Sequence, residues 1–402
     1  MTAYTSSLPL SGIRVLDLSR VFAGPWCGMV LGDFGAEVIK IEHPMRGDDT
    51  RDWSIRVGNT ETAYYNSVNR NKRSVTVDLQ KPEGQRIVCD LVKQCDVLIH
   101  NFKFGGLDKL GLGYESIKSI KSDIIYCSIS GYDRTGSEAA RPGYDLVVQG
   151  EAGLMGLNGE ASQPPLKFGI AVVDMFTGMY SAQAILAALF ERNRTKQGRH
   201  IEMALFDCGI MITSYCGLEA LVMDEDPPRY GNAHPSIVPY GVFETADSPV
   251  VITVGNNAQF ERFCREVIDR KDLADDQRFK TNLDRKINRD VLVPEILQEL
   301  KKRKRELLMN KLTKAGIPCG EVLGLLEALR SERVKAGGLV SQQPHPIEGS
   351  TPILAPPYRF DGQRLPVRMS APVLGEGTNA ILSDMLGLDK KKLTELKDKG
   401  VI

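Results

Sequence analysis

LSGIRVLDLSRVFAGPWCGMVLGDFGAEVIKIE, residues 10–42, contains two short apolar segments on either side of a glycine-rich one. The outer segments, 13–18 and 36–42, have the β-branched, apolar composition of buried strands. Between them, glycines recur at every fourth position from Gly24 to Gly32 and so share one face of a helix that can pack closely on a sheet. The stretch therefore predicts a strand, a helix and a second strand parallel to the first.

Similar segments follow along the first half of the chain. Further strands are predicted at 73–79, 95–101 and 123–130, separated by helical patterns such as PEGQRIVCDLVKQ. A long helix is expected to begin near Asp174, and RHIEMALFD at 199–207 is read as another strand. Alternating strands and helices are typical of a parallel sheet with helices on its faces, so we predict an α/β, Rossmann-like large domain.

Proline and glycine cluster in MDEDPPRYGNAHPSIVPYGVF, residues 223–243, and this cluster marks a boundary. We predict a large domain at 1–222, a small α+β domain with its linkers at 223–335, and a C-terminal segment at 336–402 that returns to the large domain. The chain length of 402 residues is consistent with two domains.

Within these parts, the turn residues around Asp247 predict a β-hairpin at 240–255. The density of proline and glycine predicts an extended connector at 335–360. Two helices, GTNAILSDMLG and KKKLTELKDKG, are expected close to the C-terminus.

The charge balance restricts the class of partner. Lysine plus arginine and aspartate plus glutamate both number 51, so no net charge attracts a nucleic acid or an anionic membrane. No GxGxxG and no GxxxxGK[ST] occurs, which argues against a dinucleotide or P-loop site. Any polyanionic ligand must then be held by a local basic site.

The cysteine pattern and the apolar segments indicate the compartment. The eight cysteines include no CxxC pair, and no histidine stands at metal-ligand spacing, so we predict reduced thiols and no metal site. Residues 175–190 are interrupted by polar side chains and are read as too short and too polar to span a bilayer. Without a secretory signal pattern, the protein is expected to be soluble and cytoplasmic, or located in the mitochondrial matrix if eukaryotic.

Asp174 is a carboxylate between two apolar runs, 170–173 and the run that continues through Leu189. Its position fits a helix N-cap, and it also fits a reacting group. The two roles are compatible, because the exposed N–H groups and the dipole of a helix start favour an ionised, nucleophilic carboxylate. Gly169 and Gly178 would let backbone approach the reacting acyl group.

Six stretches together resemble the class III CoA-transferases of the CaiB/BaiF type, and they run in family order over nearly the whole chain. They are LSGIRVLDLSRVFAGPWCGMVLGDFGAEVIKIEHPMRGDDTR (10–51), NRNKRSVTVDL (69–79), GYDLVVQGEAGLM (143–155), VVDMFTGMYSAQAILAAL (172–189), GIPCG (316–320) and APVLGEGT (371–378). The resemblance implies an interlocked homodimer of ring-like subunits. It also implies an acyl-CoA and a free carboxylic acid as substrates, with no permanently bound cofactor.

In the resemblance, Asp174 of VVDMFTG matches the aspartate that carries the acyl group. Its carboxylate would attack the donor thioester to give a mixed anhydride, and the released CoA thiolate would convert this anhydride to an aspartyl-CoA thioester. An acceptor acid would then run the same steps in reverse.

The resemblance also carries over a set of CoA contacts. They are Val21, Phe22, Ala23, His43, Arg46, Val77, Leu79, Gln80, Asn101, Phe102, Lys109, Arg141 and Tyr144. Gln80 and Lys109 depart from the lysine and arginine of the formyl-CoA transferase pattern. His43 stands where the family often has an arginine, so Arg46 is expected to hold phosphate in its place. The basic residues of the first 142 that could serve the phosphates are His43, Arg46, Arg51, Lys72, Arg73, Lys103, Lys109 and Arg141.

For the acceptor, RYGNAHPSIVPYGVF followed by VITVGNNAQF resembles the branch that uses succinyl-CoA and a dicarboxylate such as glutarate. Gly255, Asn256 and Asn257 are read as a mobile loop that covers the nucleophile and excludes water. His234 and Ser236 are candidates for binding the distal carboxylate, although His234 is equally well explained as a linker histidine bonded to backbone.

Two alternatives remain. An α-methylacyl-CoA racemase of the same fold would carry a histidine in a GHD context, where this chain has Gly143-Tyr144-Asp145. A tyrosine, with an ordinary pKa of about 10, is a poor base at neutral pH. The second alternative is a non-catalytic acyl-CoA binding protein, against which the presence of Asp174 argues.

Overall fold

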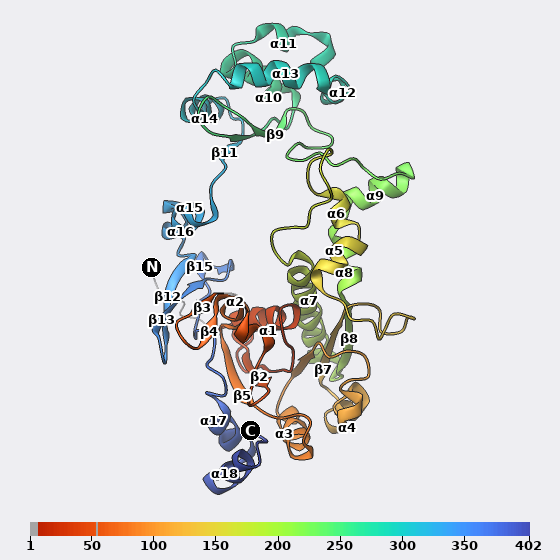
Figure 1. Ribbon diagram of the computed structural model, residues 1–402, viewed down its shortest axis with the longest axis vertical. Helices are drawn as coiled ribbons and strands as arrows, with labels where there is room; N and C mark the ends of the chain where they lie inside the picture. Colours follow the sequence, from red (N-terminus) through yellow and green to blue (C-terminus); the bar gives the residue numbers. More distant parts are fainter. Residues whose placement is uncertain (1–6, 54) are drawn as a thin grey trace. The chain divides into compact units, whose positions relative to one another are not determined.

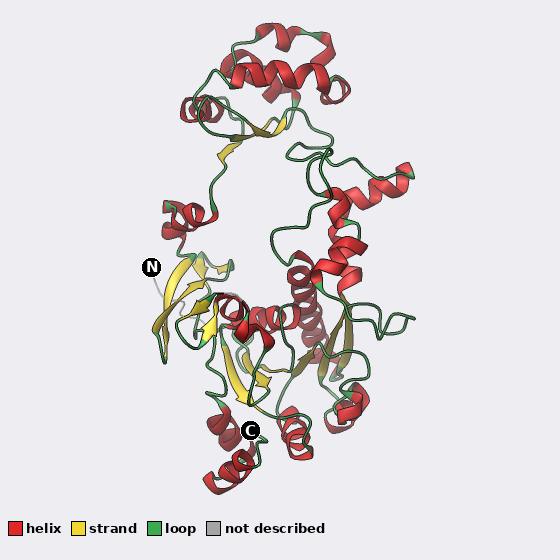
Figure 2. Ribbon diagram, viewed as in Figure 1, coloured by secondary structure: helices red, strands yellow, loops and turns green. Residues whose placement is uncertain are grey.

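A six-stranded parallel sheet forms the centre of the first of two units into which the chain divides (Figures 1 and 2). The computed structural model describes residues 7–53 and 55–402. The first unit contains the described residues up to Leu154, then Phe168–Leu218 and Glu332–Ile402. The second contains Met155–Lys167 and Glu219–Ser331, so it includes a short segment, 155–167, that lies far along the chain from the boundary expected near 223.

The sheet places the strands of the first sequence half in the order of a dinucleotide-binding fold. Across the sheet the order is β5 (Lys72–Thr76), β2 (Glu37–Glu42), β1 (Arg14–Asp17), β6 (Val97–His100), β7 (Ile125–Ser130) and β8 (Arg199–Ala204). All five pairings are parallel, which confirms the predicted α/β class. The order reverses between β1 and β6, and ligands of such sheets bind at the carboxyl ends of the strands at this point.

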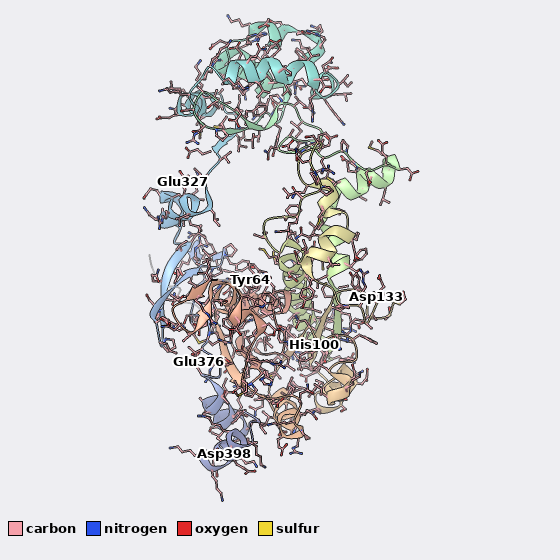
Figure 3. All side chains as sticks on the ribbon, in the orientation of Figure 1. Tyr64, His100, Asp133, Glu327, Glu376 and Asp398 are labelled. Carbon is pink, nitrogen blue, oxygen red and sulfur yellow. The ribbon has the colours of Figure 1, made fainter. Side chains whose placement is uncertain are left out.

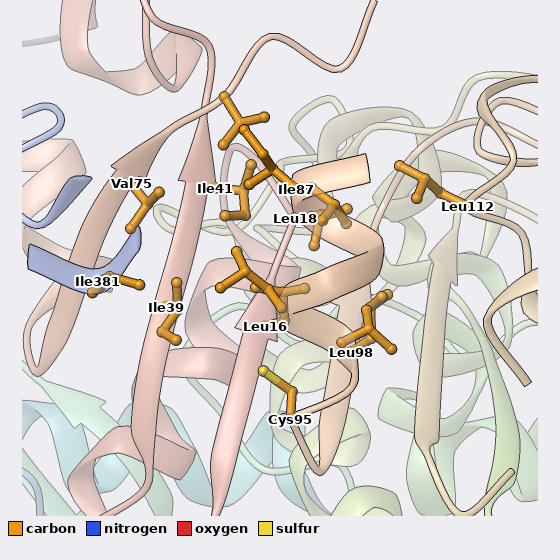
Figure 4. Packing of buried hydrophobic residues seen from close by; sticks show 14 of the residues in the cluster. Leu16, Leu18, Ile39, Ile41, Val75, Ile87, Cys95, Leu98, Leu112 and Ile381 are labelled. Carbon is orange, nitrogen blue, oxygen red and sulfur yellow. The ribbon is translucent and has the colours of Figure 1, made fainter. Parts of the chain in front are cut away.

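Alternate residues of each strand supply two separate cores. Leu16, Ile39 and Leu98 face α3 (Pro82–Val92), α4 (Tyr114–Ile120) and the C-terminal helices α17 (Thr378–Leu386) and α18 (Lys390–Asp398). Figure 4 shows this core, with Ile381 of α17 beside β5. Val15 and Val97 face the other way, into a core with α1 (Ala23–Asp33), α5 (Asp145–Glu151), α7 (Val172–Thr195) and α8 (Leu205–Ile212).

Glycines set how closely α1 lies on its neighbours. A Cβ at Gly28 would come within 2.8 Å of the Asp17 carboxylate, so only glycine leaves room for the strand residue beneath the helix. A Cβ at Gly178 of α7 would lie 2.6 Å from the Ala23 carbonyl oxygen. Gly178 therefore serves the packing of α7 on α1, and the prediction that it leaves backbone open to an acyl group is wrong.

α7 extends over 24 residues, further than the sequence pattern indicated. Among the described helices it is the one whose length and apolarity alone would allow a membrane crossing. Half of the residues in its most apolar window are buried, and the helix packs on α1 and α8. These contacts are those of a core helix.

The smaller elements of the first unit lie around the sheet. They are β3 (Arg56–Val57), β4 (Glu61–Thr62), α2 (Ala63–Asn69), α16 (Glu332–Gly337), β12 (Val340–His345), β13 (Gly349–Leu354), β14 (Arg359–Phe360) and β15 (Gln363–Arg364). Two further helices, α6 (Leu154–Leu157) and α9 (Ser214–Met223), begin in the first unit and end in the second. Short 3-10 helices cover Asp49–Asp52 and Asp108–Leu110.

The extended connector predicted at 335–360 is wrong, because β12 and β13 pair there as an antiparallel hairpin. Pro344 and Pro352 lie within these strands. Both strands of a two-stranded ribbon are edges, where a proline needs no partner for its missing N–H. The proline density that suggested a connector is thus compatible with a hairpin.

The second unit joins a small sheet to a group of helices. Its sheet has the order β11 (Cys319–Glu321), β10 (Val250–Thr253), β9 (Tyr240–Phe243), and the antiparallel pairing of β9 with β10 confirms the predicted hairpin. The helices are α10 (Asn257–Arg262), a π-helical turn at Phe263–Val267, α11 (Lys271–Asp275), a 3-10 turn at Gln277–Phe279, α12 (Asn282–Ile287), α13 (Arg289–Leu300), α14 (Arg305–Lys314) and α15 (Leu325–Arg330). Phe260, Phe263 and Ile296 belong to a core that this unit forms by itself.

Candidate active site

The loops that follow β1 and β6 are joined at the reversal point of the sheet. The Arg20 N–H donates to Asn101 Oδ1 at 2.9 Å, and Asn101 Nδ2 donates to the Arg20 carbonyl at 2.6 Å. The next residue, Val21, has a φ of +71°, a left-handed conformation that costs a β-branched residue free energy. Its N–H donates to Asp48 Oδ1 at 3.2 Å, which helps to hold this strained turn at the mouth of the site.

A cleft of about 200 Å³ lies at this point and contains Asp174. We call it the Asp174 cleft. Its lining residues are Arg20, Val21, Phe22, Ala23, Asp49, Asn101, Phe102, Lys103, Phe104, Ile129, Ser130, Gly131, Ala139, Arg141, Pro142, Gly143, Tyr144, Asp174 and Leu205. The fold thus brings seven of the predicted CoA contacts, from three separate segments of the chain, to the predicted nucleophile.

A second cavity of about 170 Å³ adjoins the first and contains the predicted phosphate-binding residues His43 and Arg46. We call it the His43 pocket. Its other walls are Leu18, Arg20, Ile41, Glu42, Gly47, Asp48, Val77, Asp78, Leu79, Gln80 and Phe102. Because Arg20 and Phe102 line both cavities, the two form one groove along the carboxyl ends of the strands.

Several of the basic residues proposed for the phosphates do not lie in this groove. Lys72 is fully buried and ion-paired with Asp17 at 2.9 Å, and the buried Arg51 pairs with Glu42 at 2.7 Å. Their charges are taken by these partners, so the hypothesis that they bind phosphate is wrong. Lys109 lies exposed on a 3-10 helix outside both cavities.

Arg73 pairs with Glu37 at 3.4 Å and also lines neither cavity. Arg20 was missed by the sequence reading, although it lines both cavities and lies over the Phe102 ring at 5.6 Å. The sequence position of Arg20 could have identified it, because a basic residue that closely follows the first strand of such a sheet lies next to the reversal point.

Asp174 is the third residue of α7, and the prediction that it is the N-cap is wrong. Ala171 occupies the N-cap position and has no capping side chain. Asp145 performs the capping instead, because its Oδ1 accepts the N–H of Val173 at 2.8 Å and that of Asp174 at 3.3 Å. No role was predicted from the sequence for Asp145, the third residue of the Gly143-Tyr144-Asp145 motif.

This arrangement reverses the expected effect on ionisation. Burial and, after it, the neighbouring negative charge of Asp145 raise the pKa of Asp174 to about 7. The helix-start N–H groups of Val173 and Asp174 donate to Asp145 and not to the Asp174 carboxylate that they were expected to stabilise. The prediction that the helix start favours an ionised Asp174 is therefore wrong, because the pKa of this carboxyl is raised rather than lowered.

Tyr64, labelled in Figure 3, experiences the same two carboxylates. Burial, followed by the charges of Asp174 and Asp145, raises the pKa of Tyr64 to about 12. Its ring packs edge-on against Phe22 of the cleft at 5.6 Å. Tyr64 stays a neutral hydroxyl beside the cleft, and the sequence reading did not identify it.

The predicted acceptor residues belong to the second unit. His234 Nδ1 accepts the N–H groups of Ser236 and Ile237 at 3.0 and 3.1 Å, and its ring packs on Tyr240 at 4.9 Å. Burial and the charge of Arg289 lower the pKa of His234. Its Nδ1 thus caps a backbone turn, as the linker interpretation of this histidine expects.

The predicted loop at 255–257 is held by its own hydrogen bonds. Asn256 is the N-cap of α10 and accepts the Gln259 N–H at 2.9 Å, while Gly255 N–H donates to Gln259 Oε1 at 2.8 Å. Asn257 accepts from Arg285 at 3.1 Å. The segment is a capped helix start, and its action on Asp174 stays a prediction.

The chain is similar over most of its length to a known protein family and to solved structures. The family model "CoA-transferase family III" matches residues 10–378. The human succinyl-CoA:glutarate CoA-transferase is 37% identical over 98% of this chain and 90% of its own length. The succinate–glutarate CoA-transferase of Agrobacterium fabrum is 41% identical over 95% of this chain and 97% of its own. The crystal structure of a CaiB/BaiF family protein from Brucella suis, 41% identical, superposes with a TM-score of 0.84 and covers 94% of this chain and 100% of that one.

Proposed function

The chain belongs to CoA-transferase family III, and from this premise we propose that it moves CoA from succinyl-CoA to a dicarboxylate of about the size of glutarate, with Asp174 as the covalent carrier. The observation that carries the proposal is the position of Asp174 in a groove that also collects the predicted CoA contacts. The relatives named for succinyl-CoA and glutarate support the choice of donor and acceptor.

The groove suits an extended ligand with a phosphorylated end and a thioester end. His43, Arg46 and Arg20 line its outer part, where CoA phosphates would meet cations. Lys103 and Arg141 line the part that holds Asp174. Arg141 is already paired with Glu138 at 2.7 Å and with Glu151, so binding a phosphate there requires an exchange of partners.

The reaction would proceed through four carbonyl substitutions. The Asp174 carboxylate attacks the succinyl thioester carbonyl, and the C–S bond breaks to give a mixed anhydride and CoA thiolate. The thiolate attacks the aspartyl carbonyl of the anhydride and releases succinate, which leaves an aspartyl-CoA thioester. The acceptor carboxylate attacks this thioester to form a second anhydride, and the thiolate then takes the acceptor acyl group and frees Asp174.

A panel of acceptor acids tests the proposed specificity. With succinyl-CoA as donor, we expect glutarate and dicarboxylates of similar length to yield new acyl-CoA thioesters, measured by mass spectrometry. Formate, acetate and carnitine serve as monocarboxylate controls. Turnover with these monocarboxylates and none with dicarboxylates would disprove the acceptor assignment, while absence of exchange with every donor would disprove catalysis.

The ionisation of Asp174 predicts a pH dependence. Its carboxylate is the nucleophile, so kcat/KM should rise with pH through about 7, the pKa that burial and Asp145 impose. Asp145→Asn removes the negative charge but retains an oxygen to cap α7. The pKa of Asp174 should then fall, and the rising limb of the profile should move to lower pH.

Asp133→Asn is the matched control, because Asp133 lies exposed and bonds to Thr135 of its own loop. It should leave the profile unchanged. A profile of Asp145→Asn that moved to higher pH, or did not move, would contradict the assigned coupling between the two carboxylates.

We also propose a homodimer, as the resemblance implies. α9 presents apolar side chains to solvent, with Leu221 and Val222 81% and 86% exposed. Apolar surface of this kind is typical of a protein interface. The double variant Leu221→Glu/Val222→Glu should shift the protein from dimer to monomer in light scattering, whereas Leu307→Glu on α14 should not. A wild-type monomer at micromolar concentration would contradict the proposal.

A further inference from the structure

A further cavity of about 420 Å³ lies on the α4 side of the sheet and shares Phe104 with the Asp174 cleft. Three polar residues cross its floor on neighbouring strands: His100 at the end of β6, Ser128 in β7 and His200 in β8. The Ser128 hydroxyl lies 2.8 Å from His100 Nε2 and 2.9 Å from His200 Nε2. Figure 3 marks the position of His100. None of the three residues lines the groove of Asp174.

We call His100, Ser128 and His200 the histidine row, and its hydrogen bonds all donate in the same direction, from His100 towards His200. The Phe102 N–H donates to His100 Nδ1 at 3.2 Å, so the hydrogen of a neutral His100 must be on Nε2, where it donates to Ser128. The Ser128 hydroxyl then donates to His200 Nε2, and a neutral His200 carries its hydrogen on Nδ1. Burial lowers the pKa of His100 to about 3 and also lowers that of His200, so both rings are neutral at pH 7.

Arg134, in the loop after β7, contributes an unsatisfied donor to the same cavity. Its side chain is 9% exposed, and its Nε lies 3.2 Å from Glu202 Oε1. Within the described part of the chain, its buried Nη1 has no hydrogen-bond partner. A buried charged donor without a partner is unfavourable, and an acceptor atom of a ligand would satisfy it.

Two solvent-exposed carboxylates lie on the cavity wall. Asp108 and Glu115 line the cavity, and neither forms an ion pair or side-chain hydrogen bond with the residues that the structure describes. A simple anion attracted by Arg134 would be repelled by both of them, because Glu202 already offsets the charge of that arginine. A ligand with one negative and one positive group would pair its negative group with the buried guanidinium and would be attracted, rather than repelled, by the two exposed carboxylates.

Aromatic rings supply the remaining surface. Tyr114 of α4 stacks on the His200 ring with centroids 4.4 Å apart, and Tyr126 packs edge-on against both. Phe104 lies under the Arg134 guanidinium at 5.3 Å. Such walls suit an apolar portion between or beside the charged groups of a small ligand.

We propose that this cavity binds a small zwitterion, an α-amino acid or a related amine-bearing acid. Its carboxylate accepts hydrogen bonds from Arg134 Nη1 and His200 Nδ1, and its ammonium group lies with Asp108 and Glu115. The cavity shares Phe104 with the Asp174 cleft, but none of the four charged or histidine groups named for the ligand lines that cleft, and the proposal does not depend on the proposed acceptor.

Calorimetric titration of the full-length protein tests this site. Glycine, L-alanine, L-leucine and L-phenylalanine are the probes, with acetate, methylamine and inorganic phosphate as single-charge controls. Saturating CoA is present throughout, so that the groove of Asp174 is filled. We expect at least one amino acid to bind and Arg134→Gln to weaken it by about tenfold or more, the effect of losing a charge-assisted hydrogen bond. Arg86→Gln, an exposed arginine of α3, should bind as wild type does.

Nitrogen NMR of the wild-type histidines gives a second measurement that needs no variant. It should show hydrogen on Nε2 of His100 and on Nδ1 of His200, with the His200 signal moving on addition of the bound amino acid. Absence of saturable amino-acid binding, an unchanged affinity in Arg134→Gln, or acetate or phosphate binding as tightly as the amino acid would each overturn the proposal.

Discussion

Asp174→Asn is expected to lower the rate of CoA transfer by on the order of 10⁴-fold or more while leaving acyl-CoA binding nearly unchanged. Asparagine has almost the same shape but cannot form the anhydride, because its amide is a poor nucleophile. The N–H of residue 174 and that of Val173 would still be capped by Asp145, so the start of α7 should remain intact. The measurement is the initial rate of thioester exchange, with CoA affinity determined by calorimetry.

Asp207→Asn is the matched control for this variant. Asp207 is also an aspartate in the first turn of a helix, α8, but it is exposed and lines neither cavity of the groove. Its substitution should leave the rate near that of wild type. Transfer by Asp174→Asn within about tenfold of the wild-type rate would exclude a covalent carrier at this position, since loss of a catalytic nucleophile costs far more.

The largest expected effect on stability comes from Lys72→Met. Lys72 Nζ donates at 2.9 Å to Asp17 Oδ2, at 2.8 Å to the Pro25 carbonyl and at 2.9 Å to Asn69 Oδ1, all in the core. Methionine fills similar space but leaves the buried Asp17 carboxylate without its ion-pair partner. Removing one partner of a buried pair typically costs about 3–5 kcal/mol. We expect a loss of that size in the free energy of unfolding, measured by denaturant titration.

Burial lowers the pKa of Lys72 to about 8, and Asp17 opposes this effect. The lysine is thus mostly charged at neutral pH and can use its three N–H donors on the three oxygens named above. The double variant Asp17→Asn/Lys72→Met should recover part of the loss, since the unpaired charge is then absent. Lys93→Met, at an exposed site that follows α3, should have little effect. Equal stability of Lys72→Met and wild type would contradict a structural role for the pair.

Local patterns in the sequence were sufficient to predict the parallel sheet. The strands β1, β2, β6 and β7 are short and rich in β-branched and apolar residues, and nearly all of their residues are buried in the structure. The glycines of residues 24–32 also act locally, because a helix face without side chains can lie directly on a sheet. The identity of Asp174 as the reacting candidate came from its motif, which the family match supports.

Only the tertiary structure decided which charges are free and which are paired. Lys72 and Asp17 are 55 positions apart, and Asp145 and Asp174 are 29 apart, so no spacing rule relates them. The ion pair with Asp17 keeps Lys72 in the core and away from the groove. Burial and the charge of Asp145 raise the pKa of Asp174 to about 7. The row of His100, Ser128 and His200 likewise exists only because three parallel strands place these residues side by side. Strand formation depends on neighbours in the chain, whereas ionisation depends on burial and on charges that folding brings together.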